Sequence, residues 1–202
     1  MTKIKFCGLT RTEDIASVNE LMPEYIGFVF VSRSKRFITQ EKAAELKQNL
    51  NPGIKAVGVF EDEELKAVAR LLNSGLIDIA QLHGKEDDTY ITRLRKLSDR
   101  SIMKAFRIQS AEDVEKAVKS SADLILLDAD AGAGRVFDWS LIRDFDRPYF
   151  LAGGLDNRNV TEAIQTFTPY GVDVSSGIET NGKKDKVKMT AFAEAVRKAE
   201  KR

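Results

Sequence analysis

The sequence contains one cysteine and one histidine, and this scarcity restricts the chemistry open to the protein. Cys7 cannot form a disulfide within the chain, and it cannot belong to a cysteine cluster that binds a metal. His83 alone excludes a zinc site with several histidine ligands. A hydrolase triad would have only this imidazole, and no Gly-x-Ser-x-Gly motif supplies its nucleophile. We therefore expect no metal site built from cysteine and histidine.

A strong charge of one sign is also missing. The 202 residues include 32 basic and 31 acidic side chains, which give a formal net charge of +1. No long-range field therefore favours nucleic acid or a membrane surface, and an anion site would have to be local. No apolar run reaches the roughly 18 residues that span a bilayer, and the N-terminus lacks a signal-peptide core. We expect a cytoplasmic protein whose partner is a small molecule, with no nucleic acid and no membrane.

What the sequence does contain is a regular alternation of short β-prone runs and amphipathic segments. The predicted strands are Ile4–Cys7, Tyr25–Phe30, Lys55–Phe60, Ile77–Gln81, Ile102–Phe106, Leu124–Asp128, Tyr149–Leu151 and Val172–Ser175. The predicted helices are Thr12–Leu21, Gln40–Asn49, Glu63–Ser74, Asp87–Ser98, Ala111–Ser120, Trp139–Phe145, Asn157–Phe167 and Lys186–Lys198. Apolar spacing supports the helices, and continuous apolar runs indicate strands of a parallel sheet buried on both faces.

Eight strands that alternate with eight helices predict the fold. This count is what a closed (βα)₈ TIM barrel requires, and such a barrel can be built from about 200 residues. An open doubly wound sheet is the alternative, but it usually carries a glycine-rich dinucleotide motif after its first strand. Here that turn reads Cys7-Gly8-Leu9-Thr10, without the motif. We predict a single α/β barrel domain over residues 1–202.

Reactive groups of a βα barrel lie at the carboxyl ends of its strands. Cys7 ends the first predicted strand, and Asp128 ends the sixth after an apolar run. A thiolate and a carboxylic acid on opposite sides of a bound sugar could transfer the protons that an isomerisation requires. Cys7 could instead be a small buried hydrophobe, and Asp128 could cap its loop. Asp130 competes with Asp128 but lies further into the loop.

The loops after the last two strands have the composition of a phosphate site. Gly153 and Gly154 allow backbone N–H groups to approach an anion closely, and Ser176 and Gly177 can add donors from the next loop. Barrels often bind phosphate with these two loops. The alternative is that these residues only form turns.

Three further side chains are candidates for substrate binding. Arg36 could hold a carboxylate through two hydrogen bonds, although it lies in a basic run that could simply be solvated. His83 could donate a hydrogen bond at the barrel mouth, or it could have a structural role. Asp173 lies near the end of the eighth predicted strand. Asp185 is a candidate N-cap for the last helix.

Nine ordered segments together resemble one known family. They are Lys5-Phe6-Cys7-Gly8-Leu9-Thr10, Gly27-Phe28-Val29-Phe30, Ser34-Lys35-Arg36-Phe37-Ile38, Val57-Gly58-Val59-Phe60, Gln81-Leu82-His83-Gly84, Leu126-Leu127-Asp128, Phe137-Asp138-Trp139, Gly153-Gly154-Leu155 with Asn159-Val160, and Val172-Asp173-Val174-Ser175-Ser176-Gly177-Ile178-Glu179. Over essentially its whole length the chain resembles phosphoribosylanthranilate isomerase, an enzyme of tryptophan biosynthesis.

The resemblance implies a barrel of the ribulose-phosphate-binding type and an Amadori rearrangement without metal or organic cofactor. It implies that Asp128 is the general acid and Cys7 the general base. Arg36 would hold the anthranilate carboxylate, and Asp173 would lie near the sugar or orient the loop. The phosphate would bind at Gly153, Gly154, Ser176 and Gly177. The quaternary state is expected to be a monomer or a homodimer.

The chain also departs from the family pattern. Phe6 is larger than the residue usual beside the base, Ser32 replaces a frequent proline, and the loop around Gly132-Ala133-Gly134-Arg135 differs. Two other functions remain open at this point. One is the related aminoaldose isomerase of histidine biosynthesis, which would need an aspartate in place of Cys7. The other is a phosphosugar-binding barrel without catalysis.

Overall fold

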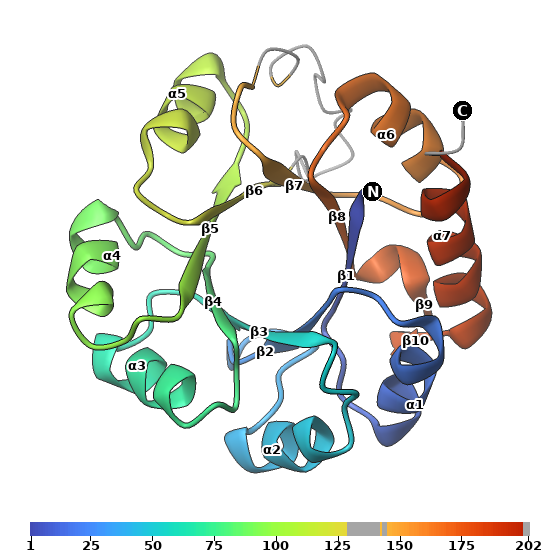
Figure 1. The fold of residues 1–202 in the computed structure, drawn as a ribbon, viewed down its shortest axis with the longest axis horizontal. Coiled ribbons are helices and arrows are strands. Elements are labelled where there is room, and N and C mark those ends of the chain that lie inside the picture. Colours follow the sequence, from blue (N-terminus) through green and yellow to red (C-terminus); the bar gives the residue numbers. More distant parts are fainter. Residues whose placement is uncertain (129–141, 143–144, 200–202) are drawn as a thin grey trace.

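The computed structural model describes residues 1–128, 142 and 145–199 of the chain. Within them, eight parallel strands close into a barrel in the order of the sequence, and helices surround it (Figure 1). The strands are β1 (Lys3–Cys7), β2 (Tyr25–Val29), β3 (Lys55–Phe60), β4 (Ile79–Leu82), β5 (Ser101–Arg107), β6 (Leu124–Asp128), β7 (Tyr149–Ala152) and β8 (Gly171–Val174). The predicted barrel is therefore confirmed.

The α-helices of the described residues are α1 (Thr12–Leu21), α2 (Gln40–Gln48), α3 (Leu65–Asn73), α4 (Asp88–Arg95), α5 (Ala111–Lys119), α6 (Val160–Phe167) and α7 (Lys186–Ala199). A 3₁₀ turn, η2 (Ser176–Ile178), follows β8. It leads into a short hairpin of β9 (Glu179–Thr180) and β10 (Lys183–Lys184), which the sequence did not predict. The predicted helix Trp139–Phe145 falls mostly outside the described residues.

The barrel follows from the alternation of side chains along each strand. One set points inward and forms a cluster that includes Tyr25, Val57, Met103, Leu126 and Phe150. The alternate set points outward and packs under the helices in a much larger cluster. Because both faces of each strand are covered, nearly every strand position is apolar. Each large side chain buried in this way contributes about 1.5–3 kcal/mol relative to an exposed one.

Helix boundaries are set by local polar groups. The Asp87 side chain accepts from Tyr90 N–H, and the Ser110 side chain accepts from Asp113 N–H, as N-caps. Asp185 accepts from the N–H groups of Val187 and Lys188, at 2.9 and 3.3 Å, which confirms its predicted place at the start of α7. The predicted element boundaries are otherwise correct to within about two or three residues, because such ends depend on caps more than on periodicity.

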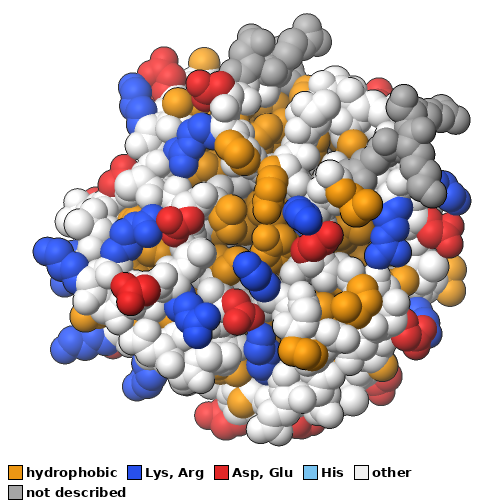
Figure 2. Space-filling view, in the orientation of Figure 1, with side chains coloured by type: hydrophobic (Ala, Val, Ile, Leu, Met, Phe, Trp, Pro, Cys, Tyr) orange, Lys and Arg blue, Asp and Glu red, His pale blue; other side chains and the backbone are white. Residues whose placement is uncertain are grey.

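The face drawn in Figure 2 shows charges of both signs. In the view of Figure 2, acidic and basic side chains are interspersed around hydrophobic side chains that gather near the barrel axis. This agrees with the balanced composition of the sequence. In the part of the chain that the structure describes, no helix is long and apolar enough to cross a membrane.

Candidate functional site

A cavity of about 530 Å³ opens at the carboxyl ends of the barrel strands. Its polar lining includes every predicted site residue except Gly177: Cys7, Arg36, His83, Asp128, Gly153, Gly154, Asp173 and Ser176. These side chains and amides come from the ends of β1, β4, β6, β7 and β8 and from the loop after β2. The barrel thus brings together groups that are distant in the sequence. Ser175, for example, is 168 positions from Cys7, and its hydroxyl donates to Cys7 O at 3.0 Å.

Cys7 ends β1 with its side chain directed into this cavity, and it is 8% exposed. Room for the thiol is provided by Gly27 on the adjacent strand β2. A Cβ on Gly27 would lie 2.7 Å from Cys7 Sγ, closer than real Cβ contacts come. Position 27 on β2 therefore has to be glycine, because any larger residue there would displace the Cys7 thiol on β1.

A thiol that is ready to act as a general base would have a lowered pKa, but the environment of Cys7 has the opposite effect. Burial raises the pKa of Cys7, and this effect outweighs the neighbouring ammonium groups of Lys5 and Lys184, which lower it. Lys5 is fully buried and pairs with Asp173, with 2.9 Å between Lys5 Nζ and Asp173 Oδ1. Burial opposes the charge of Lys5, but Asp173 and, to a smaller extent, Cys7 more than compensate, so the pKa of Lys5 is raised. A buried, charged lysine therefore lies beside the thiol.

Asp128 lies at the carboxyl end of β6, where it pairs in register with Ala152 of β7. His83 follows β4 and reaches it, with 3.3 Å between His83 Nε2 and Asp128 Oδ2. The two predicted residues therefore form one polar pair at the mouth, where both line the cavity. The substrate-binding role of His83 stays a prediction. A carboxyl group and an imidazole in this arrangement can pass a proton to a ligand atom between the strands.

Arg36 enters the cavity from the loop after β2 and is held by Glu179 of β9. Its Nε and Nη2 donate to the two carboxylate oxygens at 2.7 and 2.8 Å. Lys184 of β10 donates to the same carboxylate at 2.6 Å. Burial opposes ionisation of Glu179, but both cations outweigh it and lower the pKa of Glu179 to about 2. Two cations and one carboxylate leave this cluster with one net positive charge, which suits an anionic ligand.

Gly8 makes the position of Arg36 possible. Its φ of +81° lies in the region that favours glycine, and a Cβ there would lie 2.4 Å from Arg36 Cδ. Gly8 follows the thiol directly, so a single glycine places the end of β1 and the guanidinium against one another.

The two loops predicted to bind phosphate lie against each other. Gly153 and Gly154 have φ values of +96° and +64°, so their amides turn away from the strand direction. A Cβ on Gly177 would lie 2.0 Å from Leu155 O, so the loop after β8 packs directly on the loop after β7. Gly177 acts in this contact and is not part of the cavity lining. The phosphate roles of these residues stay predictions.

Four polar residues of this region were not singled out from the sequence as site residues: Lys5, Gln81, Glu179 and Lys184. Lys5 and Gln81 are polar at inward positions of otherwise apolar strands, and that break in the pattern is a signal that could have found them. Glu179 and Lys184 lie in the short hairpin after η2, where no periodicity marks them. Among the described residues, no group of three or more His, Cys, Asp or Glu side chains could hold a metal ion.

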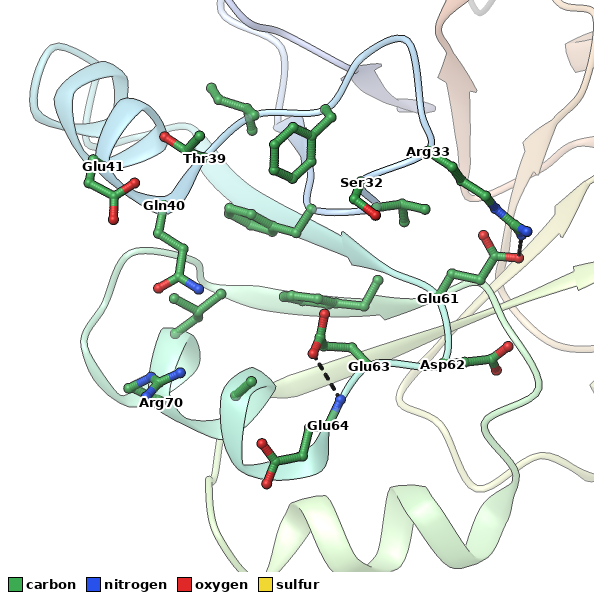
Figure 3. A pocket seen from close by; sticks show the side chains of 17 residues that line it. Ser32, Arg33, Thr39, Gln40, Glu41, Glu61, Asp62, Glu63, Glu64 and Arg70 are labelled. Carbon is green, nitrogen blue, oxygen red and sulfur yellow. Dashed lines mark hydrogen bonds and ion pairs between the residues drawn. The ribbon is translucent and has the colours of Figure 1, made fainter.

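A second, larger hollow of about 870 Å³ adjoins this cavity between α2 and α3 (Figure 3). Arg33 and Glu61 point toward one another and form an ion pair at the edge that both hollows share. Half of the labelled side chains are acidic, Glu41 and Asp62 among them, and the lining also includes aromatic side chains. This hollow contains neither the thiol nor the glycine loops, so the cavity around Cys7 is the candidate active site.

A closed βα barrel with a thiol, a carboxylic acid and glycine-rich loops at the carboxyl ends of its strands defines a class, the barrel enzymes that act on small phosphorylated substrates. Comparison with known proteins is more specific. The model of the family N-(5'-phosphoribosyl)anthranilate (PRA) isomerase matches residues 4–195. The chain belongs to this family, as its sequence motifs predicted.

Individual relatives agree over the full length. N-(5'-phosphoribosyl)anthranilate isomerase of Endomicrobium trichonymphae is 40% identical over 202 residues, which cover 98% of this chain and 99% of the relative. The corresponding protein of Thermoanaerobacter sp. (strain X514) is 42% identical over 204 residues, 98% of each chain. The crystal structure of the isomerase from Thermotoga maritima superposes with a TM-score of 0.90 at 35% identity, covering 98% of this chain and 100% of that one.

A further solved phosphoribosyl anthranilate isomerase is in complex with reduced 1-(o-carboxyphenylamino)-1-deoxyribulose 5-phosphate. It has a TM-score of 0.88 and 35% identity, and covers 98% of this chain and 100% of that one.

Proposed function

We propose that this chain converts N-(5-phospho-β-D-ribosyl)anthranilate into 1-(2-carboxyphenylamino)-1-deoxyribulose 5-phosphate, the isomerisation of its family in tryptophan biosynthesis. The observation that carries the proposal is that Cys7 and Asp128 line one cavity from different strands of the barrel. An acid and a base that flank one ligand can act on two of its atoms in a single bound state.

In the proposed reaction, Asp128 protonates the furanose ring oxygen. The C1′–O bond then breaks, the ring opens, and the nitrogen lone pair forms an iminium ion. Cys7 removes the proton from C2′, and the electrons of that C–H bond neutralise the iminium to give an enolamine. Tautomerisation of the enol gives the ketone. The chain needs only a group that donates a proton and one that accepts it, so electrons balance without an external oxidant.

The removal of a proton by Cys7 requires its thiolate. Burial raises the pKa of Cys7 and disfavours the thiolate. The adjacent ammonium of Lys5 acts in the opposite direction, because its positive charge favours the thiolate. Lys5 is itself kept protonated by Asp173 at 2.9 Å. Asp173 thus keeps Lys5 charged, although its own carboxylate raises the pKa of Cys7. Its contact with the substrate is a further proposed role.

The substrate carries a carboxylate and a phosphate, and two groups of cavity residues suit them. The Arg36 cluster, with its single net positive charge, suits the anthranilate carboxylate. The amides of Gly153 and Gly154, with Ser176 opposite, suit the phosphate. His83, 3.3 Å from Asp128, can position the acid or the substrate at the mouth.

The alternatives fit less well. The related aminoaldose isomerase of histidine biosynthesis would need an aspartate where this chain has Cys7, and the full-length relatives are anthranilate isomerases. A barrel without catalysis would have no reason to retain both Cys7 and Asp128 in one cavity.

A solved relative from Thermotoga maritima is described as dimeric. For this chain we propose a monomer or a homodimer in the cytoplasm.

Replacement of either proton-transfer residue tests the proposal. We expect Cys7→Ala and Asp128→Asn each to lower kcat by about two to four orders of magnitude, because each removes one proton transfer. The measurement is the decrease of substrate fluorescence with the purified protein. Asp99→Asn, at an exposed position away from the cavity, is the matched control and should keep the full rate. A near-normal rate in either active-site variant would refute the role of that residue.

A further inference from the structure

Within the described part of the barrel, one buried polar side-chain atom has no hydrogen-bond partner. Gln81 Oε1 is the buried side-chain N or O atom of the described residues that has no hydrogen-bond partner, and Gln81 is 1% exposed. An unsatisfied buried amide oxygen destabilises the folded protein, so native proteins rarely retain one without a reason.

The place of Gln81 in the barrel explains why no partner is available. It lies on β4 in register with Val59 of β3 and Met103 of β5. Side chains at paired positions of parallel strands point to the same side, and neither valine nor methionine can donate a hydrogen bond. Neither of these two paired side chains therefore offers the Gln81 carbonyl a donor.

The same position directs Gln81 to the candidate active site. Gln81 lines the cavity together with Cys7 and Asp128. It lies two residues before His83, so it is on the same side of the strand and about 6–7 Å deeper along it. His83 contacts Asp128 at the mouth, so Gln81 faces the space below that pair.

We propose that Gln81 is a substrate-binding residue whose Oε1 accepts a hydrogen bond from an N–H or O–H donor of the bound substrate. This inference rests on the proposed function. The substrate offers two kinds of donor, the amine that joins its aromatic ring to its sugar and the sugar hydroxyls. The unpaired acceptor destabilises the free protein, and a hydrogen bond from the bound substrate would remove this destabilisation.

The two donors have different kinetic consequences. The amine nitrogen becomes positively charged when the ring opens, and a charged donor forms a stronger hydrogen bond. A bond to the amine is therefore stronger in the transition state and supports kcat, whereas a bond to a hydroxyl has similar strength throughout and supports KM.

Gln81→Met is the main test, because methionine keeps the length and volume of the side chain but removes the unsatisfied carbonyl. We expect kcat/KM to fall about ten- to a hundredfold, while the unfolding temperature of the free protein rises by a few degrees. A residue that only supports the fold would change both properties in the same direction. A loss of activity with a lower unfolding temperature, or unchanged kinetics, would overturn the proposal.

A second variant and two ligands complete the test. Gln81→Asn keeps the carbonyl but withdraws it by one methylene, so it should lose activity without gaining stability. The reduced 1-(o-carboxyphenylamino)-1-deoxyribulose 5-phosphate should stabilise wild-type protein against heat more than it stabilises Gln81→Met. Inorganic phosphate should stabilise both equally, and an equal effect of the reduced compound on both would contradict the proposal.

Controls separate this proposal from the proposed function. Gln48→Met, on the exposed face of α2, should leave activity and unfolding temperature unchanged. If wild-type protein does not convert phosphoribosylanthranilate, the proposed function fails before Gln81 is considered. If wild-type protein is active and Gln81→Met equals it, only the role of Gln81 fails.

Discussion

At the scale of single residues, Arg36 shows how a binding group is prepared before its ligand arrives. Its Nε and Nη2 are held by Glu179, so the guanidinium has one orientation in the cavity wall. A long side chain fixed in advance loses less conformational entropy when a ligand binds. Arg33 lies in the same loop and lines the same cavity, but its side chain is 75% exposed.

This difference predicts unequal effects of two matched substitutions. Arg36→Met should raise KM about ten- to a hundredfold with a smaller change in kcat, because a charge-assisted hydrogen bond to the substrate contributes about 1.5–3 kcal/mol. Arg33→Met should change KM less than about threefold, because an exposed ion pair contributes little. Steady-state kinetics of the two variants provide the measurement, and equal KM values would contradict the carboxylate role of Arg36.

At the scale of elements, the β9–β10 hairpin is a small structure with a large effect on the cavity. It carries Glu179 and Lys184, and the backbone carbonyl of Lys184 accepts from Arg11 Nη2 at 2.6 Å. Lys184 Nζ also donates to Ser175 O at 2.9 Å, which ties the hairpin to the end of β8. Two strands of two residues each would not be stable alone, so these side-chain bonds hold the hairpin on the barrel.

The hairpin should therefore contribute a pH-dependent part of stability. The pKa of Glu179 is about 2 in the folded protein, below the usual 4.5, so the unfolded chain takes up its proton more readily. The stabilisation by ionised Glu179 is complete above about pH 5 and is lost as the pH falls from 4.5 toward 2. The difference in free energy of unfolding between wild-type protein and Glu179→Gln should shrink over that range.

Urea unfolding at a series of pH values measures this difference. Glu194→Gln, on the exposed face of α7, is the control for the loss of a carboxylate far from the cluster. A wild-type advantage over Glu179→Gln that stays constant down to about pH 3 would contradict the coupling.

At the scale of the whole molecule, the barrel closes where its first strand meets its last. Lys5 of β1 lies in register with Asp173 of β8, and their side chains form a buried ion pair across this seam. The two residues are 168 positions apart, so the pair forms only when the entire barrel is assembled. Contacts of such long range slow folding, because the chain must be ordered before they form.

The seam predicts a large effect of removing one charge and a smaller effect of removing both. Asp173→Asn leaves the buried ammonium of Lys5 without its carboxylate and should lower the free energy of unfolding by about 3–5 kcal/mol. Lys5→Met combined with Asp173→Leu removes both charges and should be less destabilised than the single variant. Chemical denaturation measures both, and a single variant as stable as the double one would contradict the role of the pair.

Much of this protein could be predicted from local pattern. The alternation of apolar runs with amphipathic segments predicted the barrel, and Cys7 and Asp128 at strand ends predicted which residues line its cavity. Gly153 and Gly154 marked a loop whose backbone has positive φ angles. These features are set by neighbours within a few residues, where strand and helix periods and turn preferences act.

The sequence by itself determined the order of elements and the types of residue at their ends. Only the tertiary structure decided that Glu179, 143 positions from Arg36, holds its guanidinium, that burial raises the pKa of Cys7, and that Gln81 Oε1 has no partner among the described residues. The physical reason is that dielectric surroundings and hydrogen-bond partners belong to the closed barrel, whose walls come from strands distant in sequence.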